Sequence, residues 1–132
     1  MSGPLIWVIE DNDQNFELVD FLLGEAGYGV ARGRDASELA QLLAGAPPAL
    51  VLLDMNLPTG SGLELLARLR ADERSRPAPV VALTAHAMRG DRERFLAAGC
   101  DGYISKPIES TAFLAAVANF LRPRSPGDGV ER

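Results

Sequence analysis

Short apolar segments alternate with helix-like segments along almost the whole chain, and this alternation constrains the fold more than any other feature. The apolar segments are Leu5–Ile9, Gly29–Ala31, Leu50–Leu53, Val80–Leu83 and Gly102–Ser105. Each is short enough for a strand, and most are continuously apolar rather than alternating with polar residues. Such strands are typical of a parallel sheet whose two faces are both covered by helices.

Apolar residues between these segments recur at intervals of three and four, as expected for helices with one face on a core. The sets are Phe16, Val19, Leu23 and Ala26; Leu63, Leu66 and Leu69; and Phe113, Val117 and Phe120. Capping boxes at 35–38 and 61–64 predict two helix starts, while Gly45 and Gly99 lie where helices should end. We therefore predict an α/β fold with a doubly wound, five-stranded parallel sheet.

Composition narrows the class of protein. The chain has 132 residues, 47% of them hydrophobic, which suits one globular domain. Its net charge of -5 argues against direct nucleic-acid binding. Cys100 is the single cysteine and fits a reducing cytosol, and no apolar run suits a signal peptide or a membrane span. We expect a cytoplasmic protein with its domain at residues 1–121, no membrane partner and a disordered tail at 122–132.

Polar side chains follow four of the apolar segments at the points where the predicted strands end. They are Glu10, Asp11, Asp54, Thr84 and Lys106. Ligands of an open α/β sheet bind at the carboxyl ends of its strands, so these five side chains should lie together. Any one acid alone could instead be a solvated turn residue, with Asn12 or Asp13 capping the next helix. The occurrence of all five at strand ends favours a binding site.

The chemistry of this residue set is limited. Three carboxylates offer the hard oxygen ligands that Mg²⁺ prefers, and Lys106 and Thr84 could hold phosphate oxygens. The strand ends carry no His-Ser or His-Cys pair, so the available nucleophile is a carboxylate. A carboxylate that attacks phosphorus gives an aspartyl phosphate, and Asp54 is the central candidate.

Four motifs in a fixed order resemble a known family. VIEDN, LVLLDMNLP, VVALTA and YISKPI are similar to the CheY-like receiver domain of two-component response regulators. The resemblance extends over about residues 5–121, and the stretch from Thr84 to Ile108 looks most like DivK-type single-domain regulators and the receivers of hybrid histidine kinases. It implies a flavodoxin-like fold with strand order 2-1-3-4-5.

The resemblance also implies a reaction. A histidine kinase or a histidine phosphotransfer protein would donate the phosphoryl group to Asp54, assisted by Mg²⁺. Asp11 and Asp54 would bind the metal directly, Glu10 mostly through water, and Asn56 through its backbone carbonyl. Lys106 would contact the phosphoryl oxygens. The protein would be a phosphoacceptor with self-catalysed phosphotransfer and autodephosphorylation rather than an enzyme.

A switch and an output surface follow from the same resemblance. Thr84 would hydrogen-bond the phosphorylated state, and Tyr103 would change rotamer. The responding surface would join the fourth helix, predicted from about Ala87 to Ala98, to the fifth strand and the last helix, where a downstream protein would bind. Asn56 and His86 are expected to tune the lifetime of the phosphoryl group, with simple solvent exposure as the alternative for His86.

Other functions stay open at this point. A haloacid-dehalogenase-type phosphotransferase would have a second Asp where this chain has Asn56, and a nucleotide-binding module would have a glycine-rich loop where it has EDNDQN. A relay, a phosphate sink and a receiver that binds partners without phosphorylation are further alternatives. Gly60-Ser61-Gly62 stands where many receivers have Met-Asp-Gly, which predicts a more flexible loop. We expect a monomer, with a dimer left open.

Overall fold

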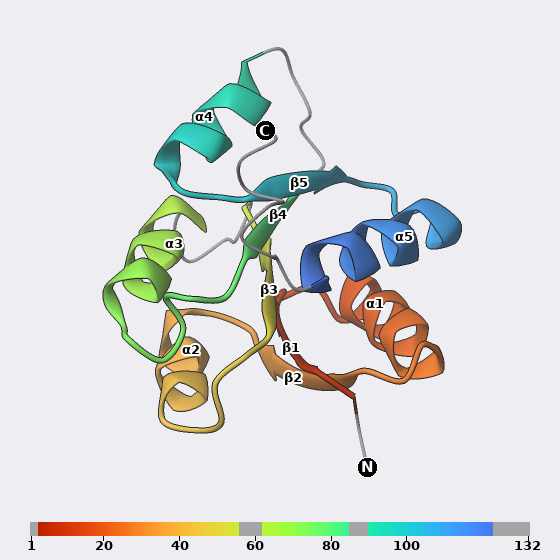
Figure 1. Ribbon diagram of the computed structural model, residues 1–132, viewed down its shortest axis with the longest axis horizontal. Helices are drawn as coiled ribbons and strands as arrows, with labels where there is room; N and C mark the ends of the chain where they lie inside the picture. Colours follow the sequence, from red (N-terminus) through yellow and green to blue (C-terminus); the bar gives the residue numbers. More distant parts are fainter. Residues whose placement is uncertain (1–2, 56–61, 85–89, 123–132) are drawn as a thin grey trace.

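The computed structural model describes residues 3–55, 62–84 and 90–122, and it contains a single five-stranded parallel sheet in these ranges (Figure 1). The strand order is β2-β1-β3-β4-β5, as predicted. The strands are β1 (Leu5–Ile9), β2 (Gly29–Gly33), β3 (Leu50–Asp54), β4 (Val80–Thr84) and β5 (Gly102–Ser105). The helices are α1 (Asp13–Glu25), α2 (Ala36–Leu43), α3 (Gly62–Ala71), α4 (Asp91–Ala98) and α5 (Ser110–Leu121). The predicted fold class is confirmed.

Helices cover both faces of the sheet, which explains the continuously apolar strands. Figure 1 shows α1 and α5 on one face and α2, α3 and α4 on the other. Successive residues of a strand point to opposite faces, so Ile6 and Val8 pack on the α1 and α5 side while Trp7 and Ile9 pack on the other. Every residue of β3 and β4 is buried. The ends of these central strands therefore lie in the interior of the molecule.

The predicted helix faces are largely confirmed, with one error. Val19 and Leu23 of α1 are fully buried. Ala26 is wrong as a core position, because α1 ends at Glu25 and Ala26 is its exposed C-cap. Leu22 is buried instead, at 8% exposure. The predicted stripes on α3 and α5 lie against the two cores, since Leu66, Leu69, Phe113 and Val117 are buried and Leu63 and Phe120 are partly buried.

Helix ends follow the predicted capping residues. Asn12 caps α1, because its Oδ1 accepts a hydrogen bond from the Asn15 N–H at 2.9 Å. Asp35 caps α2 in the same way, with the Glu38 N–H at 3.0 Å. Gly45 follows the Ala44 C-cap of α2. The second capping box begins at Ser61, which lies outside the described residues.

The fourth helix differs from its prediction at its start. It begins at Asp91 rather than near Ala87, because Gly90 has a φ of 93°, in the left-handed region, and acts as its N-cap. The predicted residues 87–89 lie outside the described ranges. The predicted end is confirmed, since Gly99 is the C-cap with a φ of 117°. The described part of α4 is therefore only two turns long.

Arg70 connects the segments at the N-terminal ends of β4 and β5. Its guanidinium, at the end of α3, donates to the carbonyls of Gly99 at 2.6 Å and Ala78 at 2.9 Å. It also forms an ion pair with Asp101 at 2.7 Å, and the same Asp101 oxygen accepts the Val80 N–H at 2.8 Å. Val80 begins β4, and Asp101 immediately precedes β5. Arg70 thus connects α3 with the segments that lead into the last two strands.

The described helices include none that is both long and apolar enough to cross a membrane. The last helix ends at Leu121, where the predicted domain ends. Residues 123–132 lie outside the described ranges, so the disordered tail stays a prediction.

Candidate functional site

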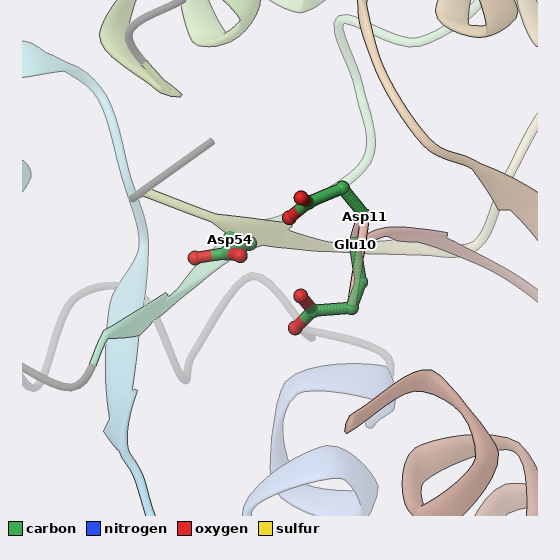
Figure 2. A group of neighbouring side chains, drawn as sticks. All are labelled: Glu10, Asp11 and Asp54. Atoms are coloured by element: carbon green, nitrogen blue, oxygen red, sulfur yellow. The ribbon is translucent and has the colours of Figure 1, made fainter. Parts of the chain in front are cut away.

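Three acids meet at the carboxyl edge of the sheet, which is the edge formed by the C-terminal ends of the strands. Glu10 and Asp11 follow β1, and Asp54 is the last residue of the neighbouring strand β3. One oxygen from each of the three carboxylates lies within 4.8 Å of the others (Figure 2). Such a group of hard oxygen donors suits a small divalent cation. The sequence prediction that these acids come together is confirmed.

The three acids differ in how far they are buried. Glu10 is fully buried and Asp54 is 3% exposed, whereas Asp11 is partly buried. The alternative that Glu10 is a solvated turn residue is therefore wrong. Burial raises the pKa of the Glu10 carboxyl, and the hydrogen bond from Lys106 opposes this shift. Figure 2 shows Glu10 and Asp11 extending from the end of β1 on the same side as Asp54.

Lys106 reaches the acids from the segment between β5 and α5. Its Nζ lies 3.0 Å from Glu10 Oε1 and 3.5 Å from Asp54 Oδ2. Its backbone N–H donates to the Thr84 carbonyl at 2.8 Å, which aligns this segment with the end of β4. One ammonium therefore contacts two of the three carboxylates.

Thr84 and Tyr103 lie on adjacent strands. Thr84 ends β4 and is 1% exposed. Tyr103, on β5, is paired in register with Ala82, and its partly buried side chain packs against the core on the side of α2, α3 and α4. Asn56 and His86 lie outside the described residues, so the tuning roles expected for them and the ligand role of Asn56 stay predictions.

Close packing requires glycine at position 62, whereas the predicted flexibility of the loop stays a prediction. Gly62 is the first residue of α3, and a Cβ there would lie 2.7 Å from Met55 Cα and 3.0 Å from the Asp54 carbonyl oxygen. Only glycine lets α3 begin so close to the end of β3. Gly60 and Ser61 lie outside the described residues.

Arg32 is a residue that the sequence analysis missed. Its Nε donates to the Glu10 carbonyl at 3.0 Å, and its Nη2 donates to the Asp11 carbonyl at 3.2 Å. The same nitrogen lies 2.9 Å from Asp13 Oδ1, and the guanidinium stacks 4.4 Å from the centre of the Phe16 ring. The predicted second strand stopped at Ala31, whereas β2 continues to Gly33. An arginine near the end of a predicted strand was the available signal.

A comparison with protein families now decides the identity of the fold. The family model of the response regulator receiver domain matches residues 6–118. The chain belongs to the response regulator receiver family. Its motifs were correctly interpreted as those of this family.

Individual relatives agree with this assignment. The chain is 40% identical to the polar-differentiation response regulator DivK of Brucella ovis over 116 residues, which cover 88% of this chain and 94% of that protein. It is 30% identical to the receiver domain of the sensor histidine kinase PA1611 of Pseudomonas aeruginosa PAO1, with a TM-score of 0.81, covering 91% of this chain and 98% of that one. That crystal structure has a magnesium ion coordinated in its active-site cleft.

A more distant solved structure supports the fold alone. The chemotaxis protein CheY4 of Vibrio cholerae is 21% identical to this chain and has a TM-score of 0.84, covering 90% of this chain and 99% of that one. The order of the five strands is therefore shared with a CheY-like receiver, while the chemistry of the site rests on the residues described above.

Proposed function

We propose that this protein is a cytoplasmic, monomeric, single-domain response regulator of a two-component phosphorelay. It accepts a phosphoryl group on Asp54 from the phosphohistidine of a histidine kinase or a histidine phosphotransfer protein. The observation that carries this proposal is the buried Asp54 carboxylate with Glu10 and Asp11 beside it and Lys106 Nζ at 3.5 Å. Neither nucleic acid nor membrane is proposed as a direct partner.

Mg²⁺ is the cofactor of the proposed reaction. The three carboxylate oxygens within 4.8 Å of one another are the donors that this ion prefers. Asp11 and Asp54 would bind it directly, Glu10 mostly through water, and the Asn56 carbonyl would complete the protein ligands. The ion supplies positive charge that offsets the repulsion between Asp54 and an incoming phosphoryl group.

The phosphoryl transfer itself is a displacement at phosphorus. An Asp54 carboxylate oxygen forms the new O–P bond while the N–P bond of the phosphohistidine breaks, and the imidazole nitrogen keeps the electron pair. Lys106 stabilises the negative charge on the phosphoryl oxygens. Its present contacts with Glu10 and Asp54 hold the ammonium close to this position before the phosphoryl group arrives. Hydrolysis of the acyl phosphate ends the signal, with Asn56 and His86 as the tuning positions.

The output of the proposed regulator is a change on the face formed by α4, β5 and α5. The Thr84 hydroxyl would move toward the phosphoryl group, and Tyr103 would occupy the space it leaves. Leu96 on α4 is 36% exposed on this part of the molecule and offers an apolar contact for a downstream protein. A coupling of about 1 to 3 kcal/mol is enough to change partner affinity several-fold.

Phosphorylation is tested with a small donor. Incubation with Mg²⁺ and acetyl phosphate should give one alkali-labile phosphoryl adduct, which peptide mapping assigns to Asp54. Asp54→Asn, or chelation of Mg²⁺, should abolish it. Labelling of the Asp54→Asn variant to the wild-type extent would contradict the proposal.

The switch is tested separately with beryllofluoride, which mimics the phosphoryl group. With Mg²⁺ it should shift amide NMR signals across α4, β5 and α5, and Thr84→Ala should suppress these remote shifts while sparing those at Asp11 and Asp54. Shifts confined to the carboxyl edge would favour a relay or a phosphate sink over a regulator.

A further inference from the structure

We infer that Arg32 is a positioning residue for the metal site, because its guanidinium holds the backbone carbonyls of both members of the acid pair. This inference rests on the proposed function, since it concerns Mg²⁺ binding by Glu10, Asp11 and Asp54. Arg32 would not touch the ion or the phosphoryl group. It would act by fixing the turn from which the Glu10 and Asp11 side chains extend.

The register of the sheet explains how Arg32 reaches this turn. In the β1–β2 pair Arg32 lies opposite Val8. The last backbone hydrogen bond between the two strands is donated by the Glu10 N–H to the Gly33 carbonyl at 3.0 Å. Beyond that bond β1 turns away into α1. Arg32 then supplies the next two hydrogen bonds from its side chain, at 3.0 Å to Glu10 O and 3.2 Å to Asp11 O.

The hydrogen bonds at the turn constrain both acids. A guanidinium is planar, so two of its N–H groups on consecutive carbonyls restrict the orientation of both peptide units. The Asn12 N–H in turn donates to Glu10 Oε2 at 3.2 Å, which directs this carboxylate within the turn. Loss of the Arg32 contacts would free the two peptide units, and the carboxylates of Glu10 and Asp11 would no longer be held beside Asp54.

The charge of Arg32 is already compensated on the far side of the turn. Asp13 accepts from Arg32 and from Arg34, both at 2.9 Å, and these two arginines lower the pKa of the Asp13 carboxyl. The Arg32 side chain is 16% exposed and stacks on Phe16, whereas that of Arg34 is 48% exposed. Among the described residues, Arg34 does not contact either carbonyl, which makes it a matched control.

A positioning role and a purely electrostatic role of Arg32 predict opposite changes in Mg²⁺ affinity when Arg32 is replaced by a neutral residue. If Arg32 affected Mg²⁺ only through its positive charge, Arg32→Gln would make the site more negative and would strengthen binding. If it positions the acids, the same substitution weakens binding despite the favourable change in charge. Arg32→Lys separates the two further, because it keeps the charge but cannot span both carbonyls with a rigid fork.

The experiment measures the dissociation constant of Mg²⁺ by calorimetry for the metal-stripped full chain and its variants. Substitution of groups that orient metal ligands typically lowers affinity by 10- to 100-fold, so we expect Arg32→Gln and Arg32→Lys each to weaken Mg²⁺ binding about tenfold. Arg34→Gln should bind Mg²⁺ as tightly as the wild type or slightly more tightly. Circular dichroism without metal checks that each variant is folded, and if Arg32→Gln does not fold, the comparison rests on Arg32→Lys.

A second readout needs no metal. Hydrogen exchange at the Asn12 amide, measured by NMR in the presence of a chelator, should accelerate in Arg32→Gln and stay unchanged in Arg34→Gln. If both Arg32 variants bind Mg²⁺ as tightly as the wild type and exchange the Asn12 amide at the wild-type rate, the positioning role is overturned while the proposed function stays intact. A wild-type protein that binds no Mg²⁺ would overturn the proposed function itself.

Discussion

The two edges of the sheet use arginine in a similar way, but they differ in how their charges are balanced. At the carboxyl edge Arg32 binds two backbone carbonyls and Asp13. At the amino edge, which is formed by the N-terminal ends of β4 and β5, Arg70 binds three backbone carbonyls and Asp101. In both cases one guanidinium connects elements that are far apart in the sequence.

The acids around the two arginines differ. Asp101 is satisfied by Arg70 and by the Val80 N–H, so the amino edge has matched charges. The carboxyl edge brings three carboxylates together, with Lys106 in contact with two of them. The raised pKa of Glu10 reflects this arrangement, because a buried carboxylate beside Asp54 is costly to ionise. The amino edge stabilises the fold, while the carboxyl edge holds negative charge ready for a cation.

The largest effect is expected at the amino edge. Arg70→Met removes the guanidinium but keeps an apolar chain. The Ala78 and Gly99 carbonyls lose this donor, and Asp101 loses its ion pair but keeps the Val80 N–H. We expect the free energy of unfolding to fall by about 2 kcal/mol in urea titrations, with an unchanged dissociation constant for Mg²⁺.

The same substitution two residues earlier on α3 provides a control for Arg70→Met. Arg68 lies on the same helix and donates to the Ala36 carbonyl at 3.2 Å from an exposed position. Arg68→Met should cost less than about 0.5 kcal/mol. Equal losses in the two variants would show that the amino edge is not held by the Arg70 contacts.

At the carboxyl edge a substitution should raise stability instead. The pKa of Glu10 is higher in the folded protein than in an unfolded chain, so the folded state favours the protonated form. This contribution to stability is complete below the unfolded pKa and is lost as the pH rises through the folded pKa. Glu10→Gln cannot ionise, so without metal it should be more stable than the wild type above that range, on the order of 1 kcal/mol.

Urea titrations in a chelator from about pH 4 to about pH 8 measure this difference. The gap between Glu10→Gln and the wild type should widen as the pH rises. Mg²⁺ should narrow or reverse it, because the ion stabilises the wild type more than a variant with a weakened site. A Glu10→Gln variant that is less stable than the wild type at neutral pH in the chelator would contradict the inference that the ionised Glu10 carboxylate lowers the stability of the metal-free fold.

The two edges were not equally visible in the sequence. The acids of the carboxyl edge follow apolar runs directly, so a local pattern and the rule for parallel sheets bring Glu10, Asp11 and Asp54 together. Arg32 and Arg70 act through backbone carbonyls that lie on other elements. Every residue has such a carbonyl, so the residue types do not show which ones accept these hydrogen bonds. Their partners depend on register and on loop geometry. The error at Ala26 has a different cause. A periodic pattern does not mark the end of a helix as clearly as its middle.

The smallest effect tests whether added stability by itself changes the site. Gly24 lies in the last turn of α1, and a Cβ there would meet nothing within 4 Å. Gly24→Ala should therefore raise the free energy of unfolding by about 0.5 to 1 kcal/mol, because alanine restricts the unfolded chain and favours the helix. Gly27 has the same open space but a φ of 92°, so Gly27→Ala should destabilise the protein. Glu10→Gln and Gly24→Ala would then both be more stable without metal, but only the first should bind Mg²⁺ more weakly. If Gly24→Ala also lost Mg²⁺ affinity, stability and metal binding would be coupled through the whole fold, and the division between the two edges would not hold.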